Sequence, residues 1–91
     1  MSHIEVRHNP EKSELDSLGV FDWPVWDHPP ARFGWVYGGT ETCYVFEGHV
    51  VVTPEDGEPV VIKAGDLVVF HAGLKCIWDV REHVRKHYIS E

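Results

Sequence analysis

Residues 41–48 read Glu-Thr-Cys-Tyr-Val-Phe-Glu-Gly, and residues 65–78 read Gly-Asp-Leu-Val-Val-Phe-His-Ala-Gly-Leu-Lys-Cys-Ile-Trp. Each stretch sets a run of β-branched and aromatic residues beside a glycine, which is typical of a β-strand next to a turn. Strand alternation places Glu41 and Cys43 on one face of the first strand. It places Cys76 and Trp78 on one face of the strand that ends the second stretch.

The same strand-and-turn pattern extends over the C-terminal two thirds of the chain. The candidate strands cover residues 33–37, 42–47, 49–53, 59–63, 66–70, 75–80 and 84–89. Asp56-Gly57 predicts a tight hairpin turn, because both residues tolerate a positive φ. Short, regularly spaced strands with one small helix indicate an all-β sandwich or barrel.

The N-terminal part differs in composition. Residues 4–7 form a candidate leading strand, and Asn9-Pro10 predicts the start of a short helix because Asn caps free amides and Pro fits the first turn. Gly19 predicts the end of that helix. The stretch 20–30, rich in Trp and Pro, predicts an extended edge segment whose tryptophans plug the core. We therefore expect one domain over residues 1–91, with a strap at 1–19 and a barrel at 20–91.

Composition limits the partners of this domain. Eight basic and fifteen acidic side chains give a net charge of −7. An acidic surface repels phosphate backbones, so nucleic acid is not an expected partner. No apolar run approaches the roughly 18 residues needed to span a membrane, and no signal peptide opens the chain. Two cysteines are too few for a disulfide framework, so we expect a cytoplasmic protein with reduced thiols.

Several candidate strands are apolar on both faces, unlike a strand with one wet face. They are residues 43–46, 50–52, 60–62 and 67–70. One face fills the barrel, and the other needs cover from a second sheet or a second subunit. A chain this short buries only about 60–65% of its unfolded surface, which leads us to expect a homodimer.

The spacing of these segments resembles that of the cupins, a family of small jelly-roll barrels. The first cupin motif matches at Glu41 and Gly48, and the second matches at Gly65 and Gly73. The histidine positions of metal-binding cupins are occupied here by other residues: Trp35, Tyr37 and Cys76. The resemblance therefore implies a cupin barrel without a histidine-coordinated metal, and no cofactor is expected.

A finer resemblance rests on five short motifs that occur in order over residues 20–90. They are Trp23-Pro24-x-Trp26, Glu41-Thr42-Cys43-Tyr44, Glu47-Gly48, Gly65-Asp66-Leu67-Val68 and Val84-Arg85-Lys86-His87-Tyr88. In this order they are similar to the short stand-alone cupins related to (S)-ureidoglycine aminohydrolase. That enzyme resembles a manganese-dependent cupin, so manganese is one alternative to a metal-free barrel. Zinc is another, held by Cys43 and Cys76 near Glu41.

In the cupin register, one set of side chains points into the barrel. The candidate ligand-binding residues are Trp35, Tyr37, Glu41, Cys43, Cys76 and Trp78, with His71 as a second-tier candidate at the rim. The aromatic rings either stack on a flat ligand or fill the barrel. The thiols are either small buried hydrophobes, the zinc pair, or nucleophiles that an acidic pocket would not activate.

Glu41 is the candidate catalytic residue. Burial without a counter-charge raises a carboxyl pKa by as much as roughly 3–5 units, which suits a general acid or a hydrogen-bonding anchor for a ligand. The alternative is a fold residue satisfied by Tyr37, a tryptophan N–H, a thiol or water.

Three hypotheses about function follow. The first is a metal-independent barrel that binds a small polar organic molecule. The second is an enzyme that acts on a small nitrogenous or sugar-like substrate, with Glu41 as acid or base and a metal as possible assistant. The third is a structural or interaction protein whose barrel is filled. An open pocket around Glu41 favours the first, and a sealed interior favours the third.

Overall fold

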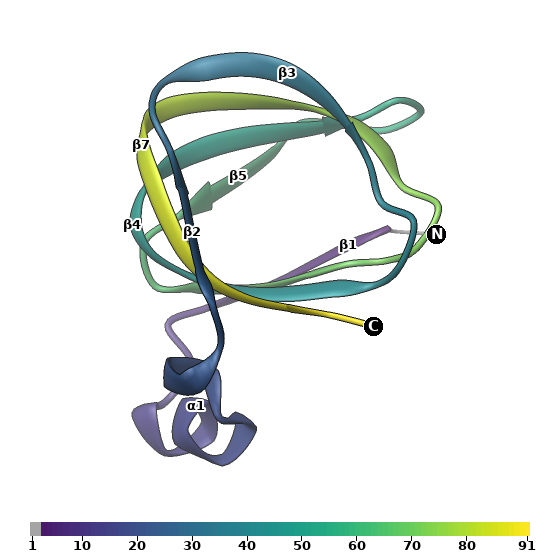
Figure 1. Ribbon diagram of the computed structural model, residues 1–91. Helices are drawn as coiled ribbons and strands as arrows, with labels where there is room; N and C mark the ends of the chain where they lie inside the picture. Colours follow the sequence, from purple (N-terminus) through teal and green to yellow (C-terminus); the bar gives the residue numbers. More distant parts are fainter. Residues whose placement is uncertain (1–2) are drawn as a thin grey trace.

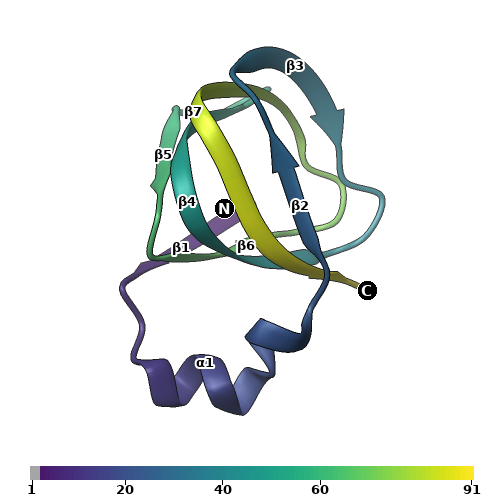
Figure 2. The ribbon, with the colours of Figure 1, turned by 60° about the vertical axis from the view of Figure 1, so that its left-hand side comes forward.

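Antiparallel strands make up most of the structure, a computed structural model that describes residues 3–91 (Figure 1). The strands are β1 (Ile4–His8), β2 (Val25–His28), β3 (Ala31–Val36), β4 (Glu41–Pro54), β5 (Val60–Lys63), β6 (Asp66–Phe70) and β7 (Lys75–Ser90). They form one sheet that curls into a jelly-roll barrel, as the sequence predicts. The helix α1 (Lys12–Leu18) and the 3-10 turn η1 (Val20–Asp22) lie outside the barrel (Figures 1 and 2). Neither of these described helices has the length and apolar character needed to cross a membrane.

The long strands β4 and β7 form the centre of the sheet. They pair from Glu41 opposite Ser90 to Pro54 opposite Cys76. The far edge of β4 pairs with β6 along its first half and with β5 along its second half. The far edge of β7 pairs with β3 and then with β2, while β1 adds to the outer edge of β6. Each central strand therefore holds two shorter strands.

This arrangement corrects the predicted strand boundaries. Residues 42–47 and 49–53 belong to the single strand β4, and residues 75–80 and 84–89 belong to the single strand β7. The sequence predicted two strands separated at Gly48, because glycine usually marks a turn. It likewise predicted a break in β7 at a run of polar residues that faces solvent but stays in the ladder.

A bulge at Gly48 reverses which residues of β4 face the core. Gly48 has a φ of 100°, and a Cβ added there would lie 2.3 Å from the carbonyl oxygen of His83. The buried β4 residues are odd-numbered before the bulge and even-numbered after it: Cys43, Val45, Val50 and Val52. The pairing with β7 shifts register three times between Val45 and Val50, and this irregular stretch lets both halves of β4 bury their apolar side chains in the same barrel.

Two apolar clusters hold the fold together. The larger fills the barrel and includes Phe70 and Trp78, with Trp26 packed against it. The smaller lies on the outer face of the sheet, where α1 and η1 cover β6 and β4. Its members are Leu15, Val20 and Leu67, with Trp23 and Tyr44 beside them. The prediction that the tryptophans of segment 20–30 plug the core therefore holds for Trp26 and is wrong for Trp23.

The predicted helix start is also wrong. The helix begins at Lys12, and its N-cap is Glu11, whose side chain makes no capping hydrogen bond. Asn9 instead has a φ of 49° and donates its backbone N–H to Gly65 at 2.8 Å, so it ends the pairing of β1 with β6. The predicted helix end is correct, because Gly19 adopts a left-handed φ of 76°.

The hairpin predicted at Asp56-Gly57 joins β4 to β5, although its turn differs in kind. The backbone N–H of Gly57 donates to Pro54 at 3.3 Å, and Gly57 does not have a positive φ. The loop between the paired residues Val52 and Val60 is long enough to turn without a left-handed residue.

Candidate functional site

A cavity of about 320 Å³ lies between β2, β3, the start of β4 and β7. Its wall consists of Trp26, Phe33, Trp35, Tyr37, Glu41, Trp78, Lys86, Tyr88 and Ser90. Six of these nine side chains are aromatic. Four of the predicted site residues meet here: Trp35, Tyr37, Glu41 and Trp78.

Two strands supply most of this wall. Phe33 and Trp35 alternate along β3, with Tyr37 directly after it, so all three point toward the same side. Phe33 pairs with Trp78 of β7, and their rings lie 6.2 Å apart at an interplanar angle of 12°. Trp35 is 52% exposed and stands at the mouth of the cavity, so it leaves the interior open.

The polar part of the wall is an ion pair. Lys86 Nζ donates to Glu41 Oε2 at 2.5 Å, and the two side chains are only 6% and 14% exposed. Removing a charge from water is costly, and a partner at this distance offsets the cost. The expectation that Glu41 is buried without a counter-charge is therefore wrong, because Lys86 supplies one.

Aromatic rings surround the ammonium group of Lys86. Its Nζ lies 4.8 Å from the ring centre of Trp78, 5.0 Å from Trp26, 5.7 Å from Phe70 and 6.0 Å from Tyr88. A cation within about 6 Å of a ring face is attracted by the ring quadrupole. The rings and the carboxylate together explain how a lysine is kept inside the barrel.

Lys86 is the functional residue that the sequence reasoning missed. Its signal was present: Val84, Lys86 and Tyr88 alternate on one face of a predicted strand whose other members of that face are apolar or aromatic. A lysine on the inward face of the strand needs an acidic partner inside the barrel. Glu41 was the carboxylate already placed there.

Tyr37 contributes a hydroxyl group to the cavity. The residue is 4% exposed, and its ring stacks on Phe70 with centres 4.8 Å apart and an interplanar angle of 5°. Burial, and then the charge of Glu41, raise the pKa of Tyr37 well above its usual range. Tyr37 therefore remains protonated and able to donate a hydrogen bond.

The indole N–H of Trp78 is buried and makes no hydrogen bond within residues 3–91. It is nevertheless close enough to the Tyr37 hydroxyl and the Cys76 thiol to lower the pKa of both groups, against the larger effect of burial. The indole N–H is therefore a buried donor that a ligand in the cavity does not contact directly.

The two thiols lie in the main core, and neither lines this cavity. Burial raises the pKa of Cys43 to about 12 and that of Cys76 to about 11. The Cys76 thiol also donates to the backbone oxygen of Trp35 at 3.6 Å. Groups held so firmly in the thiol form are poor nucleophiles and poor metal ligands at neutral pH.

His71 lies away from the cavity, directly after β6. Its Nε2 is bonded to the carboxylate of Glu5 on β1, so this pair ties the two edge strands together. The prediction that His71 lies at the rim of the pocket is therefore wrong: it does not line the cavity, and it connects β6 to β1 instead.

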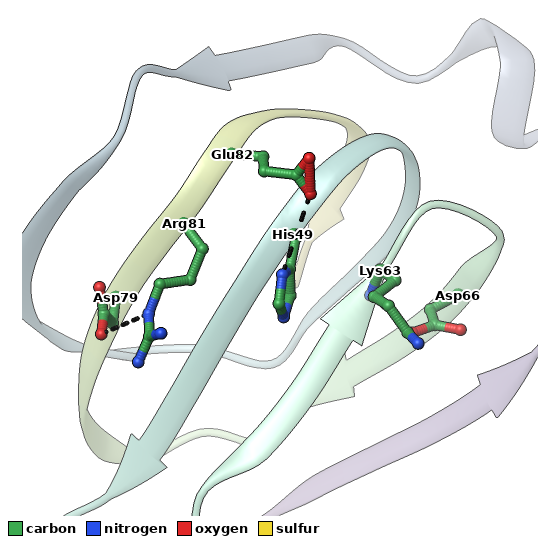
Figure 3. A network of polar contacts seen from close by, with 6 residues as sticks. All are labelled: His49, Lys63, Asp66, Asp79, Arg81 and Glu82. Atoms are coloured by element: carbon green, nitrogen blue, oxygen red, sulfur yellow. Dashed lines mark hydrogen bonds and ion pairs between the residues drawn. The ribbon is translucent and has the colours of Figure 1, made fainter.

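Two other ion pairs that join residues of the central strands are more exposed. His49 of β4 faces Glu82 of β7 at 3.9 Å, and Arg81 bonds Asp79 at 2.8 Å (Figure 3). All four side chains are at least about one third exposed, where solvent screens charge and a pair contributes little. The buried Lys86–Glu41 pair differs from them in its environment.

Comparison with known proteins gives the family of this barrel. A family model described as the EutQ-like cupin domain matches residues 15–88. The chain belongs to the EutQ-like cupins. Among curated proteins, none matches this cupin.

Solved structures agree with this assignment. A DUF861 family protein from Thermotoga maritima is 45% identical, with a TM-score of 0.93 over 97% of this cupin and 99% of that chain. A protein assigned as ethanolamine utilization protein Q from Salmonella typhimurium is 29% identical, with a TM-score of 0.65. That match covers 72% of this cupin and 53% of the Salmonella chain, so the cupin spans about half of it.

The cavity does not fit the manganese site that the resemblance to ureidoglycine aminohydrolase implies. Within residues 3–91, no three His, Cys, Asp or Glu side chains converge on one point. The carboxylate of Glu41 is already bonded to the ammonium of Lys86. The other polar wall groups are tryptophan indoles and the hydroxyls of Tyr37, Tyr88 and Ser90, none of which is a usual manganese ligand.

Proposed function

We propose that this cupin binds a small polar organic molecule in its aromatic cavity, without a histidine-coordinated metal. The observation that carries the proposal is the buried Lys86–Glu41 pair in a wall otherwise made mostly of aromatic rings. Ligand sites commonly combine an apolar lining with a few fixed polar groups. The volume of about 320 Å³ lies at the lower end of such sites, which suits a ligand with one ring.

The polar pair gives the ligand both kinds of hydrogen bond. The ammonium of Lys86 has N–H groups beyond the one bonded to Glu41, and the second carboxylate oxygen of Glu41 can accept. Hydrogen bonds are stronger where water is excluded, so these groups would orient a ligand that the rings hold by stacking.

A thermal-shift screen tests this proposal. Small metabolites and divalent ions are added separately, and we expect an organic ligand to raise the melting temperature because it binds only the folded state. The variant Glu41→Gln should respond less to the same ligand. Unchanged affinity in this variant would remove Glu41 from the site. Protein purified without a histidine tag should contain substoichiometric metal; one equivalent of zinc or manganese would contradict the metal-independent part of the proposal.

An enzyme is the second candidate, favoured by the 2.5 Å contact between an acidic and a basic group in the cavity. Glu41 would act as acid or base on a small nitrogenous or sugar-like substrate, and the narrower kinship with (S)-ureidoglycine aminohydrolase belongs to this candidate. Product formation that Glu41→Gln abolishes while ligand binding persists would favour it over simple binding. If no compound binds, the third hypothesis of a filled barrel is preferred.

The wider setting of the molecule is also a proposal. We expect a cytoplasmic homodimer acting as a single domain over residues 1–91. The two cysteines are buried and unpaired in the structure, which is compatible with a reducing compartment.

A further inference from the structure

We infer that the cavity selects an uncharged, flat carbonyl compound, whose oxygen accepts hydrogen bonds from Tyr37 and Lys86. This inference rests on the proposed function and narrows it to a ligand class. Its basis is a surplus of donors over acceptors in a cavity without net charge.

The donor surplus follows from a count of polar groups. The donors that face the cavity are the Tyr37 O–H and the remaining N–H groups of Lys86, while the hydroxyl groups of Tyr88 and Ser90 can each donate or accept. Against them stands the second carboxylate oxygen of Glu41. A buried donor without an acceptor costs about 1–3 kcal/mol, so the ligand that fits best brings an acceptor oxygen.

Two of these donors lie in the same part of the cavity. The Tyr37 ring stacks on Phe70, and Lys86 Nζ lies 5.7 Å from the centre of that same ring. The charge of Glu41 acts on Tyr37 and is bonded to Lys86, so all three polar groups are near one another. The proposal requires one carbonyl oxygen to reach both donors, while an N–H beside it reaches Glu41.

The charge balance decides between neutral and charged ligands. Lys86 and Glu41 neutralise each other at 2.5 Å, and every other lining side chain is uncharged. An anion or a cation would have to lose its hydration without a counter-charge of its own, which disfavours it strongly. An amide or a ketone avoids that cost and still supplies the oxygen.

Three nearly isosteric probes test this inference: benzamide, benzoate and benzamidinium, which carry charges of 0, −1 and +1. Binding is measured by calorimetry and by the shift of the Trp78 indole N–H resonance, assigned with a Trp78→Phe variant. We expect benzamide to bind about tenfold more tightly than either ion, because only the ions lose hydration uncompensated. Benzoate or benzamidinium binding as tightly as benzamide would overturn the inference and leave the proposed function standing. Failure of all three to bind would overturn both.

The Tyr37→Phe variant removes the hydroxyl donor but keeps the aromatic ring in the cavity wall. It removes one hydroxyl from a ring that stays stacked on Phe70, so it should fold normally. We expect it to weaken benzamide binding about twofold to tenfold, the effect of one hydrogen bond. The matched control is Tyr44→Phe, whose hydroxyl lies outside the cavity beside α1. Equal binding by Tyr37→Phe and wild type would overturn the assigned role of Tyr37.

Discussion

Lys86 decides the electrostatics of the cavity, because it turns a lone buried carboxylate into a neutral pair. A side chain that is 6% exposed is largely removed from water, so its ammonium group is stabilised by Glu41 and by the surrounding rings. Removing one member of such a pair lowers the stability of the fold far more than removing both.

We predict that Lys86→Met lowers the free energy of unfolding by about 3–5 kcal/mol, because it leaves Glu41 buried without a partner. Replacing both residues, as Lys86→Met with Glu41→Leu, should recover most of that loss. Urea denaturation measures both effects. The control is Lys75→Met, an exposed lysine of the same strand, which should change stability by no more than about 0.5 kcal/mol. A loss in Lys86→Met no larger than that of the control would contradict the buried pair.

The thiols give the fold a dependence on alkaline pH. Burial raises the pKa values of Cys43 and Cys76 from an ordinary 9.0 to about 12 and about 11. Between pH 9 and 11 the unfolded chain releases protons that the folded chain retains, so stability should fall as pH rises through this window. Below it, the thiols contribute no pH dependence. Unfolding by urea at several pH values measures the slope, and the Cys43→Ala, Cys76→Ala double variant should show a smaller one. Equal slopes in the two proteins would assign the effect to other groups.

The sequence predicted four of the nine residues that line the cavity. Glu41, Tyr37 and Trp78 follow from motif spacing and strand alternation, both of which are local. Lys86 was missed because β7 was divided into two predicted strands, so the phase of its second half was not tied to Trp78. The partner of a buried charge is a long-range property that only the paired strands reveal.

Among the elements, β4 depends on an irregular stretch around Gly48. The bulge at Gly48 allows its two halves to face one core although their buried residues differ in parity. The sequence correctly indicated an irregularity at Gly48, but the prediction of a turn there was wrong, because the strand continues through it. Glycine signals a positive φ in both cases, and only tertiary pairing decides whether the strand stops or bulges.

We predict that Gly48→Ala destabilises the protein by about 2–5 kcal/mol. The added Cβ would meet the backbone of His83 at 2.3 Å, and the φ of 100° is unfavourable for alanine. Thermal or urea unfolding measures the change. Gly38→Ala is the matched control, because it has open space for a Cβ and no positive φ. Similar stability of the two variants would show that the bulge relaxes easily.

For the whole molecule, the fold class was predictable because strand length, turn residues and motif spacing all indicated the same barrel. What covers the outer apolar face was not predictable, and a homodimer stays a prediction. A groove of about 590 Å³ on the outside includes Trp35, Val36 and Ile77, whose exposures are 52%, 60% and 39%. Exposed apolar side chains grouped in this way commonly mark a contact surface.

We expect sedimentation experiments to give twice the mass of the chain, with a second copy covering this groove. Ile77→Lys should shift the protein toward a monomer, because it places a charge on that surface. Val61→Lys serves as control, since Val61 is 47% exposed on β5, outside the groove. A monomeric wild-type protein at high concentration would contradict the prediction, and dissociation by the control alone would move the interface to β5.

Trp78 and Lys86 belong to one uninterrupted strand whose inward residues keep the same parity from Cys76 to Tyr88. The wall of the cavity and its positive charge are therefore linked by pleat geometry. A single residue inserted near Glu82 would rotate Lys86 to the outside while Trp78 stayed in place, whereas a double insertion would return the ammonium inward. Even-numbered and odd-numbered changes of length in this segment thus have opposite effects on the interior.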